Sequence, residues 1–177
     1  VEMMPLLRQR LRRDWVQLLC WIIGAVVLGY AGYAGVTQSY GTHSDRVTVL
    51  AAVMANPVIM MFRGLPSGAS EGQFMAFEIL PWLTMLAALM STFLAVRHSR
   101  GDEEAGRAEL VAATPAARSL PTIATLIHGV AANVVLGVLV ALSLIGAKLD
   151  AGGSWLTGAV SATTGIAFLG IGLLAAQ

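Results

Sequence analysis

The fold is decided by stretches such as Leu120 to Ala147, LPTIATLIHGVAANVVLGVLVALSLIGA, which holds no Asp, Glu, Lys or Arg. A helix needs roughly 20 mostly apolar residues to cross the hydrocarbon of a bilayer. Comparable apolar stretches run from Trp15 to Val36, from Phe74 to Val96 and from Trp155 to Ala176. The sequence therefore predicts an all-α, polytopic membrane helix bundle with about four transmembrane helices, over 15–36, 74–96, 120–147 and 153–177.

Composition agrees with a membrane protein. Apolar residues make up 56% of the chain and charged residues 12%, and the mean hydropathy is +0.74. Such a chain has too little polar surface to cover a water-soluble globule. The net charge of +1 argues against a nucleic-acid partner. The single Cys20 excludes a disulfide within the chain.

Basic residues predict the orientation. Eight of the eleven lie either before the first span or between the second and third spans: Arg8, Arg10, Arg12, Arg13, Arg97, Arg100, Arg107 and Arg118. The positive-inside rule therefore places the N-terminus and the 97–119 loop in the cytoplasm. A cleavable signal peptide is the competing interpretation of the first stretch, but that stretch exceeds the roughly 7–15 residues of a signal core.

Residues 4–14, MPLLRQRLRRD, place leucines and arginines at helical spacing. This pattern predicts an amphipathic helix at the membrane surface, with Leu7 and Leu11 in the acyl boundary. The arginines expected to meet anionic head groups are Arg8, Arg10, Arg12 and Arg13. The alternative is a plain basic flank that only fixes the topology.

The connection 37–73 is much longer than a turn and is expected outside the cell. Its apolar segment Val47 to Met54 predicts a short helix that Ser44 or Asp45 caps. Pro57 disfavours helical geometry at Asn56, so we expect that helix to stop there. His43 has no partner at metal-ligand spacing.

Two polar residues of the third span, His128 and Asn133, must face another helix or a watery cavity. They are candidates for the substrate path, and the alternative is a hydrogen bond between helices. No carboxylate lies deep in any span to complete a proton relay. No catalytic set and no metal-ligand spacing appear, so we expect neither a catalytic nor a metal site. Small residues four apart, such as Gly158 and Ala162, predict close helix packing.

The loop between the second and third spans begins RHSRGDEEAGRAEL at Arg97. Asp102 is a candidate N-cap, Glu103 and Arg107 are spaced as an i,i+4 pair, and Pro115 follows. These signals predict a short helix across the membrane face. A loop that is simply solvated is the alternative.

Three segments carry a resemblance to a known family: Arg8 to Trp21, Ala55 to Gly64 and Arg97 to Leu110. In this order, they resemble the elbow helix, an external Asn-Pro element and the cytoplasmic loop of a family of permease subunits. The family is that of actinobacterial-type ABC exporters, also described as the polyketide-antibiotic or tetronasin exporter group. Members of that family are usually long permeases with two six-helix halves. The resemblance therefore implies that this chain is an N-terminal part, with the remaining half of the permease as a partner.

The resemblance also implies that the 97–119 loop holds a coupling helix, which docks on a separate ABC ATPase subunit. Its residues would be Gly101, Asp102, Glu103, Glu104, Gly106, Arg107, Glu109 and Leu110. The chain has no phosphate-binding Gly-rich loop ending in Lys and Ser or Thr. We therefore expect ATP and Mg²⁺ on the partner subunit and no cofactor on this chain, which would export apolar or amphipathic small molecules from a bacterial plasma membrane.

Two other functions remain open. A membrane scaffold or assembly protein would use the loop to recruit a partner without ATPase coupling. An ion-coupled secondary transporter normally needs ionisable residues or broken helices at the midplane. Because the spans offer only His128 and Cys20, the permease is the preferred hypothesis and the scaffold is second.

Overall fold

The computed structural model describes residues 3–104 and 119–176. Within them the chain forms α1 (Met3–Ser39), α2 (His43–Met54), α3 (Pro57–Arg63), α4 (Glu71–Arg97), α5 (Arg100–Glu104), α7 (Leu120–Gly146) and α8 (Ala151–Ala175). Four of these helices, α1, α4, α7 and α8, are long and apolar enough to cross a membrane. The predicted all-α membrane bundle is confirmed.

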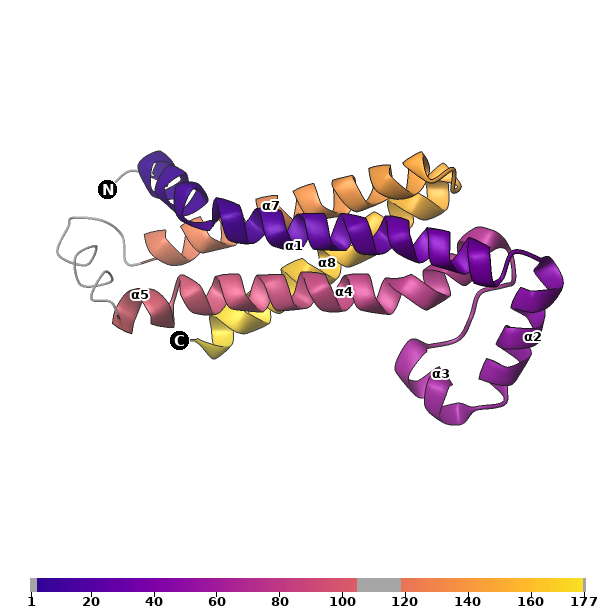
Figure 1. Ribbon diagram of the computed structural model, residues 1–177. Helices are drawn as coiled ribbons and strands as arrows, with labels where there is room; N and C mark the ends of the chain where they lie inside the picture. Colours follow the sequence, from indigo (N-terminus) through magenta and orange to yellow (C-terminus); the bar gives the residue numbers. More distant parts are fainter. Residues whose placement is uncertain (1–2, 105–118, 177) are drawn as a thin grey trace.

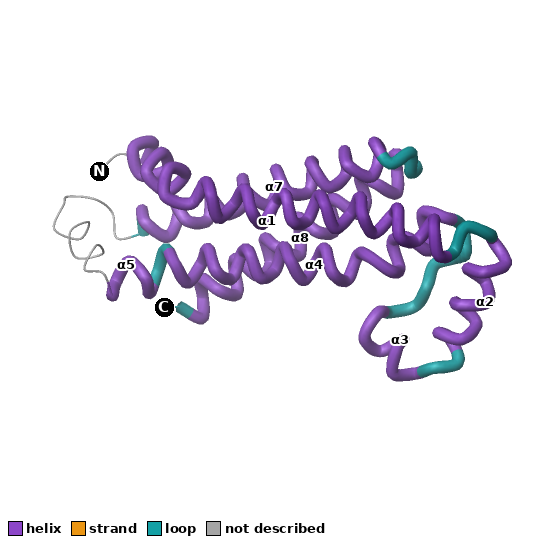
Figure 2. Tube along the Cα trace, in the orientation of Figure 1, coloured by secondary structure: helices purple, strands orange, loops and turns teal. Residues whose placement is uncertain are grey.

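The long helices run alongside one another (Figures 1 and 2). α8 packs against α4 and α7, and α1 packs against the same two helices. Many outward side chains are apolar, among them Leu19, Val135 and Leu156, which are 51%, 47% and 66% exposed. Lipid tolerates such a surface, whereas contiguous apolar surface of this kind is rare on soluble monomers.

Residues 4–14, predicted as an amphipathic surface helix, form the first turns of α1 without a break before the first span. These turns bend away from the axis of the rest of α1 (Figure 1). Beyond the bend, Arg10 and Asp14 of α1 contact α7, and these contacts position the site described below.

Small residues hold α7 and α8 together. A Cβ added to Gly158 would lie 2.2 Å from the carbonyl oxygen of Gly137, and one added to Gly137 would lie 2.6 Å from that of Gly158. No side chain fits at either position unless the helices separate. The backbones therefore approach closely, as small residues at helix interfaces allow.

The connection 37–73 contains two helices, α2 and α3, bent by 103° to each other. α2 begins earlier than predicted because Thr42 is its N-cap and forms a capping box with Asp45. α3 was not predicted. Asn56 accepts hydrogen bonds from the first amides of α3, and Pro57 occupies its first turn, where a missing N–H costs nothing.

Two charged side chains hold this segment: Arg46 joins its two ends to each other, and Arg63 joins it to the bundle. Arg46 is 9% exposed and donates to the carbonyl oxygens of Ala69, Tyr40 and Gly41. Arg63 forms a 2.7 Å ion pair with Glu78 of α4. Glu78 is therefore part of the attachment of α3.

Candidate functional site

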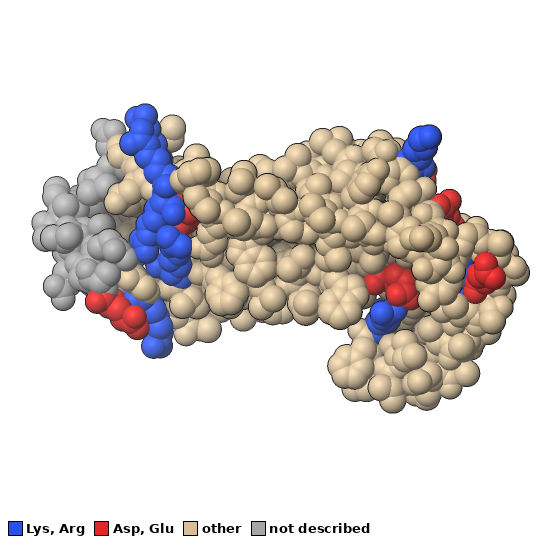
Figure 3. All heavy atoms as spheres, viewed as in Figure 1, with Lys and Arg blue, Asp and Glu red and all other residues tan. Residues whose placement is uncertain are grey.

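The charged residues that the structure describes gather at the two ends of the bundle (Figure 3). One end, here called the basic end, carries Arg8, Arg10, Arg12, Arg13, Arg97 and Arg100. The face between the two ends shows neither basic nor acidic side chains in this view. This distribution is typical of a membrane protein, whose middle lies in the hydrocarbon of the bilayer and whose two ends face water.

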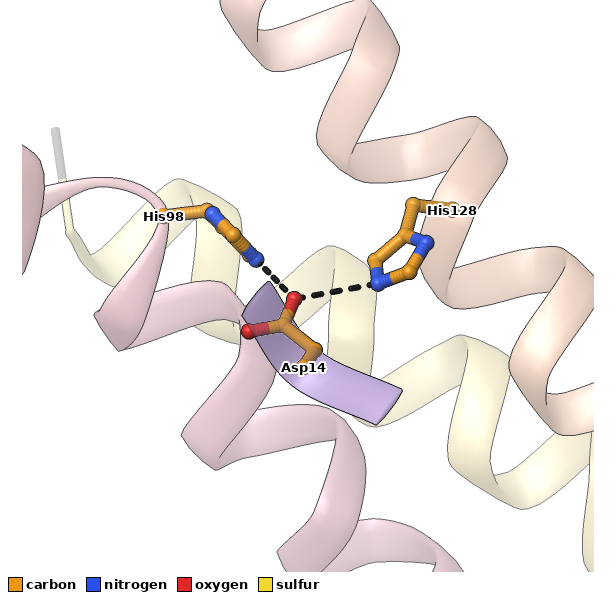
Figure 4. Close-up of side chains that lie close together, drawn as sticks. All are labelled: Asp14, His98 and His128. Carbon is orange, nitrogen blue, oxygen red and sulfur yellow. Dashed lines mark hydrogen bonds and ion pairs between the residues drawn. The ribbon is translucent and has the colours of Figure 1, made fainter. Parts of the chain in front are cut away.

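Asp14 of α1 lies at the centre of a buried cluster near the basic end. Its carboxyl oxygen Oδ2 lies 2.5 Å from Nε2 of His98 and 3.1 Å from Nε2 of His128. The two imidazoles approach it from α4 and α7 (Figure 4). The other oxygen, Oδ1, lies 3.1 Å from Nε of Arg97. Three helices therefore meet at one carboxylate.

Burial makes these contacts necessary. The side chain of Asp14 is 1% exposed and that of His98 0%. A buried carboxylate is tolerated only where charges and hydrogen bonds replace its water. The ion pair with Arg97 and the bonds from His98 and His128 supply that replacement.

One face of α1 makes the flanking contacts as well. Arg10, Asp14 and Gln17 are spaced i, i+4 and i+7, so they lie on the same side of the helix. Arg10 is 5% exposed and donates to Thr125 Oγ1 and to the carbonyl oxygen of Pro121, both on α7. Gln17 Oε1 accepts from Arg97 of α4 at 2.5 Å. Polar contacts thus join α1 to α4 and α7 near the basic end.

The cluster lies beside α5. His98 is the C-cap of α4, and α5 begins two residues later at Arg100. α5 is therefore next in the chain to Arg97 and His98, which contact Asp14.

The predicted coupling residues are only partly described. Gly101, Asp102, Glu103 and Glu104 lie in α5, whereas Gly106, Arg107, Glu109 and Leu110 lie outside the described residues. The prediction that Asp102 is the N-cap is wrong, because the helix already begins at Arg100.

The arginines predicted for the membrane surface divide into two groups. Arg8 and Arg12 are exposed and Arg13 is half-buried. Arg10 instead faces α7. It is only 5% exposed, because its guanidinium donates to Thr125 and Pro121.

The structure places both polar residues of the third span in contacts between helices. His128 bonds to Asp14 of α1. Asn133 is fully buried and donates to Ser91 Oγ of α4 at 2.8 Å. A Cβ at Gly165 of α8 would collide with its amide, so that glycine makes room for Asn133.

Asp14 and His98 were missed from the sequence. No pairing of Asp14 with His128 was predicted, whereas α1 continues through Asp14 and places its carboxylate beside His128. The available signal was Asp14 itself, the one acidic residue within a basic segment.

Two hollows beside the described residues of the bundle bear on the site. A groove of about 920 Å³ lies between the start of α1 and α7, with Arg8, Leu11, Arg12, Ile127 and His128 among its lining residues. A cavity of about 660 Å³ lies at the opposite end, where Glu71, Lys148 and Asp150 accompany apolar side chains of α4 and α8. The first hollow is the one that reaches the Asp14 cluster.

The fold and the buried cluster define a multi-pass α-helical membrane protein whose spans are joined near one end by a carboxylate and two imidazoles. The chain is similar to a multidrug efflux system permease protein of Mycobacterium tuberculosis, with 32% identity over 173 residues, which is 97% of this chain and 31% of that protein. The chain therefore spans about a third of the length of this relative. No family model matches the chain.

Proposed function

We propose that this chain is the membrane-spanning permease part of an ATP-driven ABC exporter, which moves apolar or amphipathic small molecules out of the cytoplasm. The observation that carries the proposal is the similarity of nearly the whole chain to a protein named as a multidrug efflux permease. The four apolar helices are consistent with it. The complete transporter would also contain the remaining part of the permease and an ABC ATPase that binds ATP and Mg²⁺.

The proposal assigns coupling to α5 and the residues after it. In this topology the basic end faces the cytoplasm, as the positive-inside rule predicts. Asp102, Glu103 and Glu104 give α5 negative charge that complements a basic groove on an ATPase subunit. Movement of α5 would pass through His98 and Asp14 to the ends of α1 and α7. A packed bundle with two discrete arrangements converts such movement into alternating access.

The test is affinity purification of the complex from native membranes, with ATPase activity measured for the wild type and for Glu103→Arg combined with Glu104→Arg. We expect an ATPase subunit to co-purify with the wild type and the double charge reversal to release it or to abolish transport-linked hydrolysis. Glu71→Arg is the matched control, because Glu71 is exposed at the far end of the bundle. Its charge reversal should leave the complex intact.

The same experiment separates the permease from a membrane scaffold. A scaffold would keep its partner bound. The rate of ATP hydrolysis by that partner would then change neither with the Glu103→Arg and Glu104→Arg substitutions nor with added drug-like molecules. Absence of any ATPase from the purified complex would contradict the permease proposal.

A further inference from the structure

Asp14, His98 and His128 form a group of three potential metal ligands. One ligand atom from each lies within 4.8 Å of the others, and all three residues are buried. We propose that this cluster is a binding site for a divalent transition-metal ion, with Zn²⁺ as the best match. This inference concerns the cluster alone and does not require the permease proposal to hold.

The ligand atoms already converge. The Nε2 atoms of His98 and His128 both face Oδ2 of Asp14, at 2.5 Å and 3.1 Å, and the two rings are nearly perpendicular (Figure 4). Ligands of a tetrahedral zinc ion, at bond lengths of about 2.0–2.2 Å, are roughly 3.3 Å apart. Rotation of the Asp14 and His98 side chains would have to widen their 2.5 Å separation toward that spacing, whereas the 3.1 Å separation of Asp14 and His128 is already close to it.

The ligand types select the class of ion. Imidazole favours zinc, copper, iron and nickel, whereas magnesium and calcium prefer oxygen ligands alone. Two histidines and one carboxylate form a set found at zinc sites with an open fourth position. Water or another small ligand would complete the tetrahedron.

The protonation states of the two histidines are compatible with a metal ion in place of the hydrogen bonds. For Oδ2 to accept from both rings, each histidine must carry a proton on Nε2. A metal ion between the three groups takes the place of these protons, and a neutral imidazole then holds its proton on Nδ1 instead. One ion would therefore satisfy all three ligands at once.

Arg97 is the neighbour that opposes a cation. Its Nε lies 3.1 Å from Oδ1 of Asp14, and its side chain is 35% exposed. It pairs with Oδ1 and leaves Oδ2 to the ion, and solvent screens part of its charge. Arg97→Gln should therefore increase the affinity for Zn²⁺, because it removes a positive charge close to the ion.

The groove between the start of α1 and α7 supplies access. It has a volume of about 920 Å³, and His128 is one of its lining residues. An ion that enters the groove at the basic end would reach His128 first and then Asp14. Arg8 and Arg12 also line the groove, so we expect slow rather than diffusion-limited association.

The test uses the full-length protein purified in detergent without a histidine tag. Zinc is titrated and the bound metal counted by mass spectrometry after desalting. We expect about one Zn²⁺ per wild-type chain, and affinity on the order of 100-fold weaker in His98→Ala and His128→Ala. The matched control is His43→Ala, because His43 lies at the start of α2 and far from the cluster in the fold. It should bind like the wild type.

A second measurement needs no variant, which protects the test against variants that fail to fold. Wild-type protein loaded with Co²⁺ should show the intense visible absorption of a four-coordinate site, and added Zn²⁺ should displace it. Weak octahedral absorption, or zinc binding unchanged in the His98→Ala His128→Ala double variant, would overturn the proposal. The cluster would then be a hydrogen-bonded ion pair that binds no metal.

Discussion

The side chain of Asp14 is buried and contacts Arg97, His98 and His128 in place of water. These three partners come from two other helices. Local sequence patterns cannot predict these contacts. Asp14 stands 84 residues from His98 and 114 from His128. In the sequence it follows Arg12 and Arg13, at the end of the segment predicted as an amphipathic helix at the membrane surface. The packing of α1 against α4 and α7 makes it a buried group.

We expect Asp14→Ala to lower the free energy of unfolding by about 3 kcal/mol, because removal of one member of a buried charged cluster leaves its partners without compensation. Loss of helical circular dichroism during chemical unfolding in detergent measures the change. Asp45→Ala is the control, since Asp45 is an exposed capping residue of α2 whose loss should cost about 1 kcal/mol or less. Equal losses in the two variants would contradict a special role for the cluster.

At the scale of helices, apolar length alone was sufficient to predict the four spans, because a bilayer imposes a minimum on each. The short helices were harder to predict. Pro57 predicts that a helix stops before Asn56, and α2 does end at Met54, but Pro57 also occupies the first turn of α3, which was not predicted. The start of α5 at Arg100 was also missed, because Asp102 offered a more conventional cap.

The close contact of α7 with α8 gives a second prediction. Gly158→Ala should lower the free energy of unfolding by about 1–3 kcal/mol, because its methyl group would collide with the backbone of Gly137. Gly170→Ala, elsewhere in α8, meets open space and should be neutral or stabilise by up to about 1 kcal/mol through helix propensity. The same unfolding measurement compares them. If both variants unfold alike, the two backbones are farther apart than the structure places them.

For the whole molecule, orientation depends on how the charges divide between the two ends. Six arginines of the described residues lie at the basic end, whereas Arg46 and Arg63 at the other end are engaged by carbonyl groups and by Glu78. Among the described residues, six basic side chains therefore lie at one end against Arg46, Arg63 and Lys148 at the other, and this asymmetry is what retains a segment in the cytoplasm.

We therefore expect α2 to face outward and α5 to face the cytoplasm. The measurement places single cysteines at Thr48 and Glu104, which are both exposed, in a Cys20→Ala background that removes the native thiol. A membrane-impermeant maleimide should label Thr48→Cys in intact cells, and Glu104→Cys only after the membrane is opened. The cysteine-free parent reports background labelling. The reverse pattern would place α5 outside, where no ATPase can reach it, and would exclude the coupling role as well as the orientation. Labelling of both positions in intact cells would mean that the chain inserts in two orientations, so the arginines of the basic end would not be sufficient to fix its topology.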